Sequence, residues 1–184
     1  MQIEAEGCWL RPVREGDVPA IARACQDPEI ARWLPHLPHP YRVEDARSFV
    51  ELATAGREHG REWAFAIVDE TATLLGVINV RLTEDPPTVG YWLAREARGR
   101  GIATAATIAI SQWTFETFQP PRLALHAEPE NLASVRVAEK SGFVCVPGSI
   151  RGLEGRELWV FELQRATRQA STIPGETGLK GPSQ

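Results

Sequence analysis

Two glycines and two arginines share one short segment that is suited to binding an anion. Residues 98–103 read Arg-Gly-Arg-Gly-Ile-Ala and follow the aromatic run Gly90-Tyr-Trp-Leu-Ala94. We expect an apolar helix to begin near Gly101, and the first turn of a helix has backbone N–H groups without intrahelical partners and carries the positive end of the helix dipole. Gly99 and Gly101 remove side chains that would keep a phosphate away. The segment therefore predicts a pyrophosphate site.

Three other glycine-rich patterns do not fit this segment. A Walker loop requires Lys after its glycines, and the dinucleotide-binding pattern G-x-G-x-x-G requires a third glycine where this chain has Thr104. Arginine-glycine tracts that bind RNA are repetitive, whereas this segment runs directly into Ile102-Ala-Thr-Ala-Ala-Thr-Ile108. An ordinary turn between a strand and a helix is the alternative that binds nothing.

The segment resembles the cofactor motif of the GCN5-related N-acetyltransferase (GNAT) superfamily, Q/R-x-x-G-x-G/A. Arg98, Gly101 and Ala103 occupy the fixed positions of this motif. A second block, Asn131-Leu-Ala-Ser-Val-Arg-Val-Ala-Glu-Lys-Ser-Gly-Phe143, resembles the N-x-x-S…K-x-G-F segment that completes the acetyl-CoA site of the same superfamily.

Two N-terminal blocks resemble one branch of this superfamily, the ribosomal-protein N-acetyltransferases. They are Trp9-Leu-Arg-Pro-Val-Arg-Glu-Gly-Asp17 and Asp27-Pro-Glu-Ile30. The resemblance covers residues from about 8 to 163, with its blocks in the right order.

The resemblance implies acetyl-CoA as the cofactor and assigns its contacts. The backbone groups of Leu93 and Ala94 would face the pantetheine arm. Asn131 would contact the arm through its side chain, and capping the following helix is a second role that does not exclude the first. The pyrophosphate would be held by N–H groups of Arg98, Gly99, Arg100, Gly101, Ile102 and Ala103.

The implied reaction is acetyl transfer from the thioester to a primary amine by direct attack in a ternary complex. Backbone N–H groups near Leu93 would polarise the thioester carbonyl. Some members protonate the departing thiolate with a tyrosine, but the residues around Phe143 offer no such hydroxyl. Ser134 is then the candidate acid, as in the ribosomal-protein branch, and a capping or packing role is its alternative.

The general base is where the chain departs from its relatives. Many of them read Glu-Ile/Val-Gly-Tyr-Trp, whereas this chain has Thr88-Val-Gly-Tyr-Trp92, and Thr88 cannot act as a base at neutral pH. Glu84 and His126 are the candidates, the latter because its usual pKa suits proton removal. Deprotonation through ordered water is a further alternative. A last alternative is that the chain has lost turnover and serves as an acyl-CoA-binding sensor or interaction module.

The acceptor site is expected where the first helices and the following loop cover the amine pocket. The acceptor would be the α-amine of a protein N-terminus, or a small molecule such as a polyamine or an aminoglycoside. His36-Leu-Pro-His39 falls short of a zinc pattern, so no metal is expected. A plain surface loop is the alternative to a pocket rim. The residues assigned to the acceptor are Trp33, His36, Tyr41 and, from the strand, Thr88.

Hydrophobic periodicity and helix caps predict the elements that position these residues. Asp17 and Asp27 are expected to cap two short helices. The predicted longer helices are 43–58, 101–118 and 131–140. The predicted strands are 8–12, 63–68, 74–82, 89–94, 123–127, 143–146 and 158–163.

This order of elements predicts the α/β class, with a mixed, largely antiparallel central sheet flanked by helices. The resemblance adds that two central strands splay apart and hold the acyl-CoA between them. Residues 1–163 are assigned to a single GNAT-like domain. Residues 164–184 are polar and poor in large apolar side chains, which is typical of a disordered tail.

Length and composition agree with one enzyme-sized domain in the cytoplasm, without pointing to a particular activity. The chain has 184 residues and a formal net charge of −4, so a basic surface for nucleic acid or anionic lipid is not indicated. Cys8, Cys25 and Cys145 form no C-x-x-C pair, which is typical of free thiols in a reducing compartment. No apolar run resembles a signal peptide or a membrane span. A homodimer is one of the assemblies that the sequence leaves open.

Overall fold

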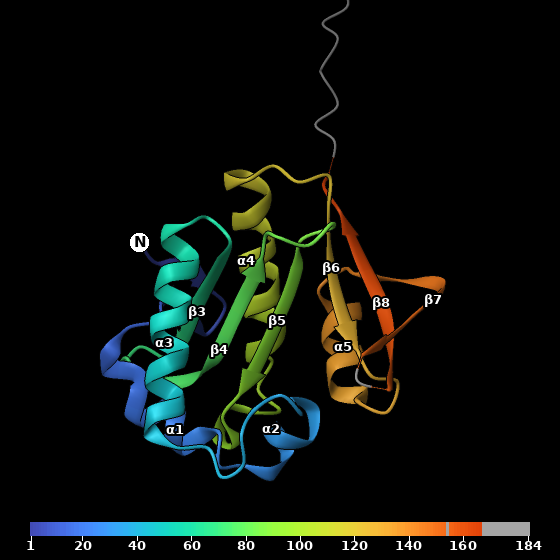
Figure 1. Ribbon diagram of the computed structural model, residues 1–184. Coiled ribbons are helices and arrows are strands. Elements are labelled where there is room, and N and C mark those ends of the chain that lie inside the picture. Colours follow the sequence, from blue (N-terminus) through green and yellow to red (C-terminus); the bar gives the residue numbers. More distant parts are fainter. Residues whose placement is uncertain (154, 167–184) are drawn as a thin grey trace, which may run out of the picture.

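Eight strands form one sheet with helices on both faces (Figure 1), in a computed structural model that describes residues 1–153 and 155–166. The strands are β1 Ile3–Ala5, β2 Cys8–Pro12, β3 Glu62–Val68, β4 Leu74–Arg81, β5 Thr88–Leu93, β6 Arg122–Ala127, β7 Val144–Leu153 and β8 Arg156–Gln164. The helices are α1 Val18–Ala24, α2 Pro28–Trp33, α3 Val43–Glu58, α4 Ile102–Thr117 and α5 Leu132–Lys140. Short 3₁₀ turns cover Glu15–Asp17 and Arg95–Ala97.

The order of strands across the sheet is β1-β2-β3-β4-β5-β6-β8-β7. Every neighbouring pair is antiparallel except β5 and β6, which are parallel. That parallel pair consists of only two residue pairs, Thr88 with Ala124 and Val89 with Leu125, after which the strands diverge (Figure 1). The predicted α/β fold, with a mixed sheet and two central strands that part, is therefore confirmed.

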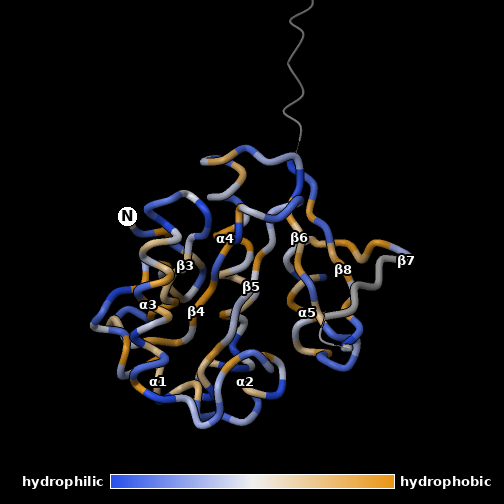
Figure 2. The backbone as a smooth tube through the Cα atoms, viewed as in Figure 1, coloured by the Kyte–Doolittle hydropathy of each residue, from blue (hydrophilic) through white to orange (hydrophobic). Residues whose placement is uncertain are grey.

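Each face of the sheet has its own apolar core. Alternate residues of a strand point to opposite faces, so Ile78 and Val89 pack with Ile110 of α4, while Val77 packs with Val50 of α3. Figure 2 shows hydrophobic stretches along β3, β4 and α4 in the interior, and hydrophilic segments mostly at the surface. We call these two sides the α4 face and the α3 face. Within the described part of the chain, no helix is both long and apolar enough to cross a bilayer.

The structure departs from the predicted elements at two strands. β1 is not predicted, because three residues are too few to show an alternating pattern; it forms a hairpin with β2. β7 extends well beyond the predicted residues 143–146. Pro147 and Gly148 read as breakers, yet they lie where pairing with β8 is interrupted, between Cys145 and Ile150, and such an irregularity accommodates a proline. The predicted tail begins inside β8, and its part beyond residue 166 lies outside the described residues.

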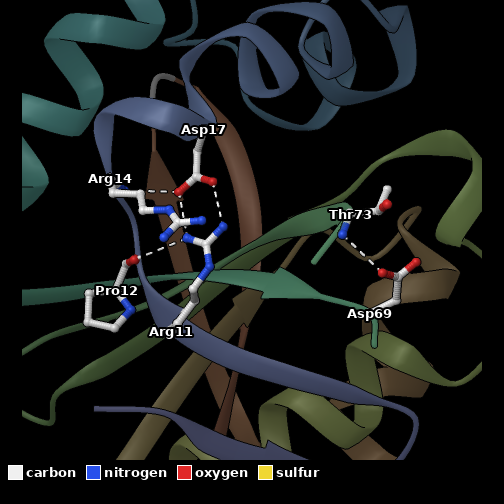
Figure 3. Close-up of polar contacts among 6 residues, drawn as sticks. All are labelled: Arg11, Pro12, Arg14, Asp17, Asp69 and Thr73. Carbon is white, nitrogen blue, oxygen red and sulfur yellow. Dashed lines mark hydrogen bonds and ion pairs between the residues drawn. The ribbon is translucent and has the colours of Figure 1, made fainter. Parts of the chain in front are cut away.

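The helix after Asp17 begins as predicted, but the Asp17 carboxylate does not cap it. The carboxylate instead accepts hydrogen bonds from both terminal nitrogens of Arg11, at 2.6 and 2.8 Å, and from the Arg14 N–H at 2.9 Å (Figure 3). Asp17 is only 4% exposed, and its hydrogen bond raises the pKa of the Arg11 guanidinium. This buried pair joins the second strand to the first helix. Asp27, in contrast, caps α2 as predicted, through the Glu29 N–H.

Asp17→Asn is expected to lower the free energy of unfolding by about 3 kcal/mol, because it leaves the Arg11 charge buried without its partner. Urea denaturation followed by circular dichroism measures this change. Glu15→Gln is the matched control, since Glu15 forms an exposed ion pair with Arg47 and should cost less than about 1 kcal/mol. Equal effects of the two substitutions would show that the buried pair does not stabilise the fold.

Candidate functional site

The diverging strand β5 presents backbone groups toward the gap beside β6. The Ala94 N–H donates to the Leu75 carbonyl at 2.8 Å, and β5 pairs with β4 in antiparallel register. Backbone groups of an antiparallel strand alternate in direction, so those of Tyr91 and Leu93 face away from β4. Among the described residues, no strand pairs with Gly90–Leu93 on that side. The N–H groups of Tyr91 and Leu93 are thus available to an extended ligand.

Arg98 reinforces this edge. Its Nε and Nη2 atoms donate to the Leu93 carbonyl at 3.2 and 3.0 Å, and Nη2 lies 2.8 Å from Oδ2 of Asp27, the residue that caps α2. The Arg98 backbone N–H is also engaged, with the Arg95 carbonyl at 3.3 Å. The prediction that the Arg98 N–H binds the pyrophosphate is therefore corrected. Arg98 joins the gap edge to α2.

The residues after Arg98 fit an anionic group. Gly99 and Gly101 have φ angles of 74° and 80°, which glycine adopts without strain, and a Cβ at either position would have nothing within 4 Å. The first hydrogen bond of α4 runs from the Ala105 N–H to the Gly101 carbonyl. The N–H groups of Ile102 and Ala103 consequently have no acceptor within the helix. Open space, free donors and the helix dipole meet here, as a pyrophosphate requires.

Ser134 lies beside β5 on the α4 face. Its Oγ is 3.0 Å from the hydroxyl of Tyr91, and its backbone N–H donates to Oδ1 of Asn131 at 3.1 Å. Asn131 thus caps α5 through its carbonyl oxygen, the second of its predicted roles, which leaves its NH₂ group for a ligand. Burial raises the pKa of Tyr91 to about 12, against the opposing effect of the Ser134 hydrogen bond. Tyr91 therefore carries its proton at neutral pH.

Tyr91 is a candidate functional residue that the sequence analysis did not identify. The expected tyrosine would follow the Asn131 block, whereas this one comes from β5, two residues before Leu93. The alternation of side chains along β5 predicts that Tyr91 lies on the same face as Leu93, and this is the sequence signal that could have identified it. The contact with Ser134, 43 residues later in the chain, depends on how α5 packs against the sheet.

The three candidate polar residues near the acceptor strand have different positions. Thr88 is 2% exposed and donates its hydroxyl to the Pro86 carbonyl at 3.3 Å, so its predicted place in the acceptor site is not supported. Glu84 pairs with Arg81 at 3.2 Å in the turn before β5. This turn lies at the start of β5, whereas Leu93 lies at its other end. His126 lies on the α3 face of β6, one residue beyond the last pair with β5. Only His126 lies beside the gap.

The predicted acceptor residues are also separated. Trp33 ends α2 and is half-buried under the Arg32 guanidinium, and His36 is exposed in the following loop. Tyr41 is only 4% exposed and packs in the core of the α3 face, where burial raises its pKa. The prediction that Tyr41 forms a pocket rim is therefore corrected, because its ring faces the interior.

The end of α2 is held to the far half of the sheet by Arg156. The Nη2 atom of Arg156 donates to the Arg32 carbonyl at 2.9 Å and lies 2.9 Å from Oε2 of Glu128, which follows β6. These contacts span from α2 to the turn after β6. Figure 1 shows α2 close to the C-terminal end of β5, on the side toward α5.

The three cysteines differ in exposure, and their reactivity should differ accordingly. Cys8 and Cys25 are each 2% exposed, and burial raises the pKa of Cys25 to about 12 and that of Cys8 in the same direction. Cys145 is exposed. We expect an aromatic disulfide reagent to modify one thiol of the native protein rapidly and none in Cys145→Ser. Fast modification of more than one thiol would contradict the buried positions of the other two.

Comparisons with known proteins identify the family and the fold. A family described as the acetyltransferase (GNAT) domain matches residues 8–144. The chain is 24% identical to the uncharacterized N-acetyltransferase p20 of Bacillus licheniformis over 142 residues, which is 75% of this chain and 79% of that protein.

Two solved structures share the fold at low identity. The ribosomal-protein-S5-alanine acetyltransferase of Vibrio fischeri aligns with a TM-score of 0.78 and 22% identity, over 89% of this chain and 96% of its own. The spermidine N-acetyltransferase of Vibrio cholerae, solved with CoA and spermine, aligns with a TM-score of 0.71 and 19% identity, over 86% of this chain and 96% of its own.

Proposed function

The chain belongs to the acetyltransferase (GNAT) family, and we propose that it transfers an acetyl group from acetyl-CoA to a primary amine while both substrates are bound. The observation that carries this proposal is the edge of β5. Beyond Val89 it has backbone donors without a partner strand among the described residues, with the anion site at one end and Ser134 on the α4 face. An extended thioester and an attacking amine can meet at this edge.

Different residues of the gap bind different parts of acetyl-CoA. The N–H groups of Ile102 and Ala103, with the open space at Gly99 and Gly101, bind the pyrophosphate. The N–H groups of Tyr91 and Leu93 bind the pantetheine arm and polarise the carbonyl that is attacked. Acetyl-CoA supplies the activated acetyl group when it is bound. Arg98 already satisfies the Leu93 carbonyl with two hydrogen bonds, so the group that Leu93 still offers to a ligand is its N–H.

Two proton transfers accompany the reaction. Ser134 donates its hydroxyl proton to the departing sulfur. In this role its Oγ is free to accept a hydrogen bond from the Tyr91 hydroxyl, which lies 3.0 Å away. A proton must also leave the attacking amine. His126 accepts it, directly or through ordered water, because it is the candidate beside the gap and its usual pKa is suited to the step. Glu84 is the weaker candidate, since it pairs with Arg81.

The acceptor is the α-amine of a protein N-terminus or the amine of a small molecule. The two solved relatives named above represent these classes, a ribosomal-protein acetyltransferase and a spermidine acetyltransferase. The α2 helix and its following loop, with Trp33 and His36, form the side of the gap from which the acceptor enters.

A second function is an acyl-CoA-binding module without turnover, favoured by the burial of Thr88 at the position where the resemblance to the superfamily implies a glutamate. Release of free CoA across N-terminal peptides, polyamines and aminoglycosides distinguishes the two. It should be measured on Cys145→Ser if a thiol reagent is used, alongside calorimetric titration with acetyl-CoA. Turnover with one class of amine supports the enzyme. Tight binding of acetyl-CoA without turnover across the panel supports the module.

A further inference from the structure

A polar pair crosses β3 and β4 on the α3 face. Asn79 of β4 donates from Nδ2 to Oε1 of Glu62 on β3. A carboxylate only accepts hydrogen bonds, so the NH₂ group of Asn79 must face Glu62 and the carbonyl oxygen must point the other way. Both side chains are half-buried. Glu62 therefore fixes the orientation of the Asn79 amide, and a charge-assisted hydrogen bond of this kind is stronger than a neutral one.

The Asn79 carbonyl oxygen lies over Gly90 of β5. Asn79 and Gly90 are direct partners in the β4–β5 register, and a Cβ at Gly90 would be 2.9 Å from Oδ1 of Asn79. Gly90 has no left-handed backbone conformation that would require glycine. Its missing side chain instead leaves the space that the Asn79 carbonyl enters.

This carbonyl is directed to the start of the gap. Gly90 is the first residue of β5 beyond its pairing with β6, and continuing that register would place it opposite His126. All four residues of this arrangement lie on the α3 face of the sheet: Glu62, Asn79, Gly90 and His126. Ala64 and Val77 lie two residues from Glu62 and Asn79 on the same strands and pack in the core of the α3 face. Val89 and Leu125 directly precede Gly90 and His126 and pack in the core of the α4 face, so the residues that follow them point to the α3 face. The α3 face is also the side on which α2 lies. A hydrogen-bond acceptor thus projects over Gly90 toward the candidate base.

We propose that the Asn79 side-chain carbonyl binds the acceptor amine by accepting one of its N–H groups, an inference that rests on the proposed function. A primary amine has enough hydrogens to bind Asn79 and still pass one to a base. The charge of Glu62 strengthens the Asn79 carbonyl as an acceptor and favours an amine that arrives as a cation. An amide oxygen accepts without removing a proton. Asn79 thus holds the amine while a different group removes its proton. Thr88 does not hold the amine.

Binding of an amine to the protein saturated with free CoA tests this role without depending on turnover. The probes are a serine-initiated tetrapeptide with a free α-amine, spermidine and kanamycin, titrated by calorimetry, and the N-acetylated tetrapeptide is the probe without the amine. Asn79→Leu should weaken binding of the best amine about tenfold, as loss of one hydrogen bond implies. Glu62→Gln should weaken it less, about threefold, because a neutral amide can still accept from Asn79.

Gly90→Ala provides an independent variant. Its methyl group would displace only the end of the Asn79 side chain, so the protein should fold while amine binding weakens about as much as in Asn79→Leu. Gly16→Ala is the matched control, since its nearest contact would be Arg14 Nε at 3.9 Å, far from the sheet pair. The affinity for acetyl-CoA should change less than about twofold in all four variants.

The outcomes separate this inference from the proposed function. Unchanged amine affinity in both Asn79→Leu and Gly90→Ala would overturn the role of Asn79, whatever the wild type does with acetyl-CoA. Failure of the wild type to bind any of the three amines would overturn it as well. A wild type that binds an amine through Asn79 yet transfers no acetyl group would contradict the proposed function alone.

Discussion

Gly101→Glu is expected to abolish acetyl-CoA binding, with an affinity loss of at least about a hundredfold. Gly101 precedes the first turn of α4, and a side chain there would enter space where no protein atom lies within 4 Å of the Cβ position. A carboxylate in that space would compete with the phosphates for the N–H groups of Ile102 and Ala103 and would repel their charge. Calorimetric titration with acetyl-CoA measures the loss.

Gly101→Ala distinguishes the effect of the added charge from the effect of replacing glycine at a positive φ. Gly101 has a φ of 80°, so alanine imposes a strain of about 1 kcal/mol but adds no charge and meets no neighbour. We expect this variant to bind acetyl-CoA within about tenfold of the wild type. Near-wild-type affinity in a Gly101→Glu protein with an unchanged far-UV circular dichroism spectrum would refute the pyrophosphate position.

Ser134→Ala is expected to lower kcat by about a hundredfold while the KM for acetyl-CoA changes less than about threefold. The hydroxyl acts on the departing sulfur, so its loss is felt mainly in the transition state. Tyr91→Phe should lower kcat less, about tenfold, because Tyr91 acts on sulfur only through Ser134. Initial-rate kinetics at saturating amine measures both. An unchanged kcat in Ser134→Ala would remove Ser134 from the reaction.

The pH dependence provides a further control for this pair. Burial raises the pKa of Tyr91 to about 12, so the phenol stays protonated and can donate to Ser134 at every pH below that value. The rate should therefore not fall between neutral pH and about pH 10 through ionisation of Tyr91. Tyr91→Phe should consequently keep the shape of the wild-type pH profile. A fall in rate at basic pH that the wild type shows and Tyr91→Phe lacks would mean that the phenol ionises within this range.

Local patterns were sufficient to predict most elements of this fold. The spacing of Ala46, Val50 and Ala53 predicted α3 with its observed bounds, and these three residues are buried. Asp27 followed by proline predicted the start of α2. The glycines at 99 and 101 predicted the turn before α4. Each of these signals lies within a few neighbouring residues, where propensity and capping act.

Contacts between distant segments could not be predicted in the same way. The sequence predicted a role for the Arg98 backbone N–H, but no local pattern predicts that the Arg98 guanidinium meets Asp27, which lies 71 residues earlier in the chain. Tyr41 lies in a loop as predicted, but its ring packs in the core and not at a pocket rim. Asn79 showed no motif at all, since its importance depends on Glu62 and Gly90 as cross-strand neighbours. These roles arise from strand register and packing, which no local pattern contains.

The most direct test of acetyl transfer at the gap between β5 and β6 uses acetyl-CoA labelled with ¹³C in the acetyl group. The wild type and Ser134→Ala are incubated with the amine panel, and the amines are analysed by mass spectrometry. We predict labelled N-acetyl product from one class of amine, formed much more slowly by Ser134→Ala. Absence of labelled amine from a wild type that binds acetyl-CoA would contradict the proposed transfer and leave the chain as an acyl-CoA-binding module.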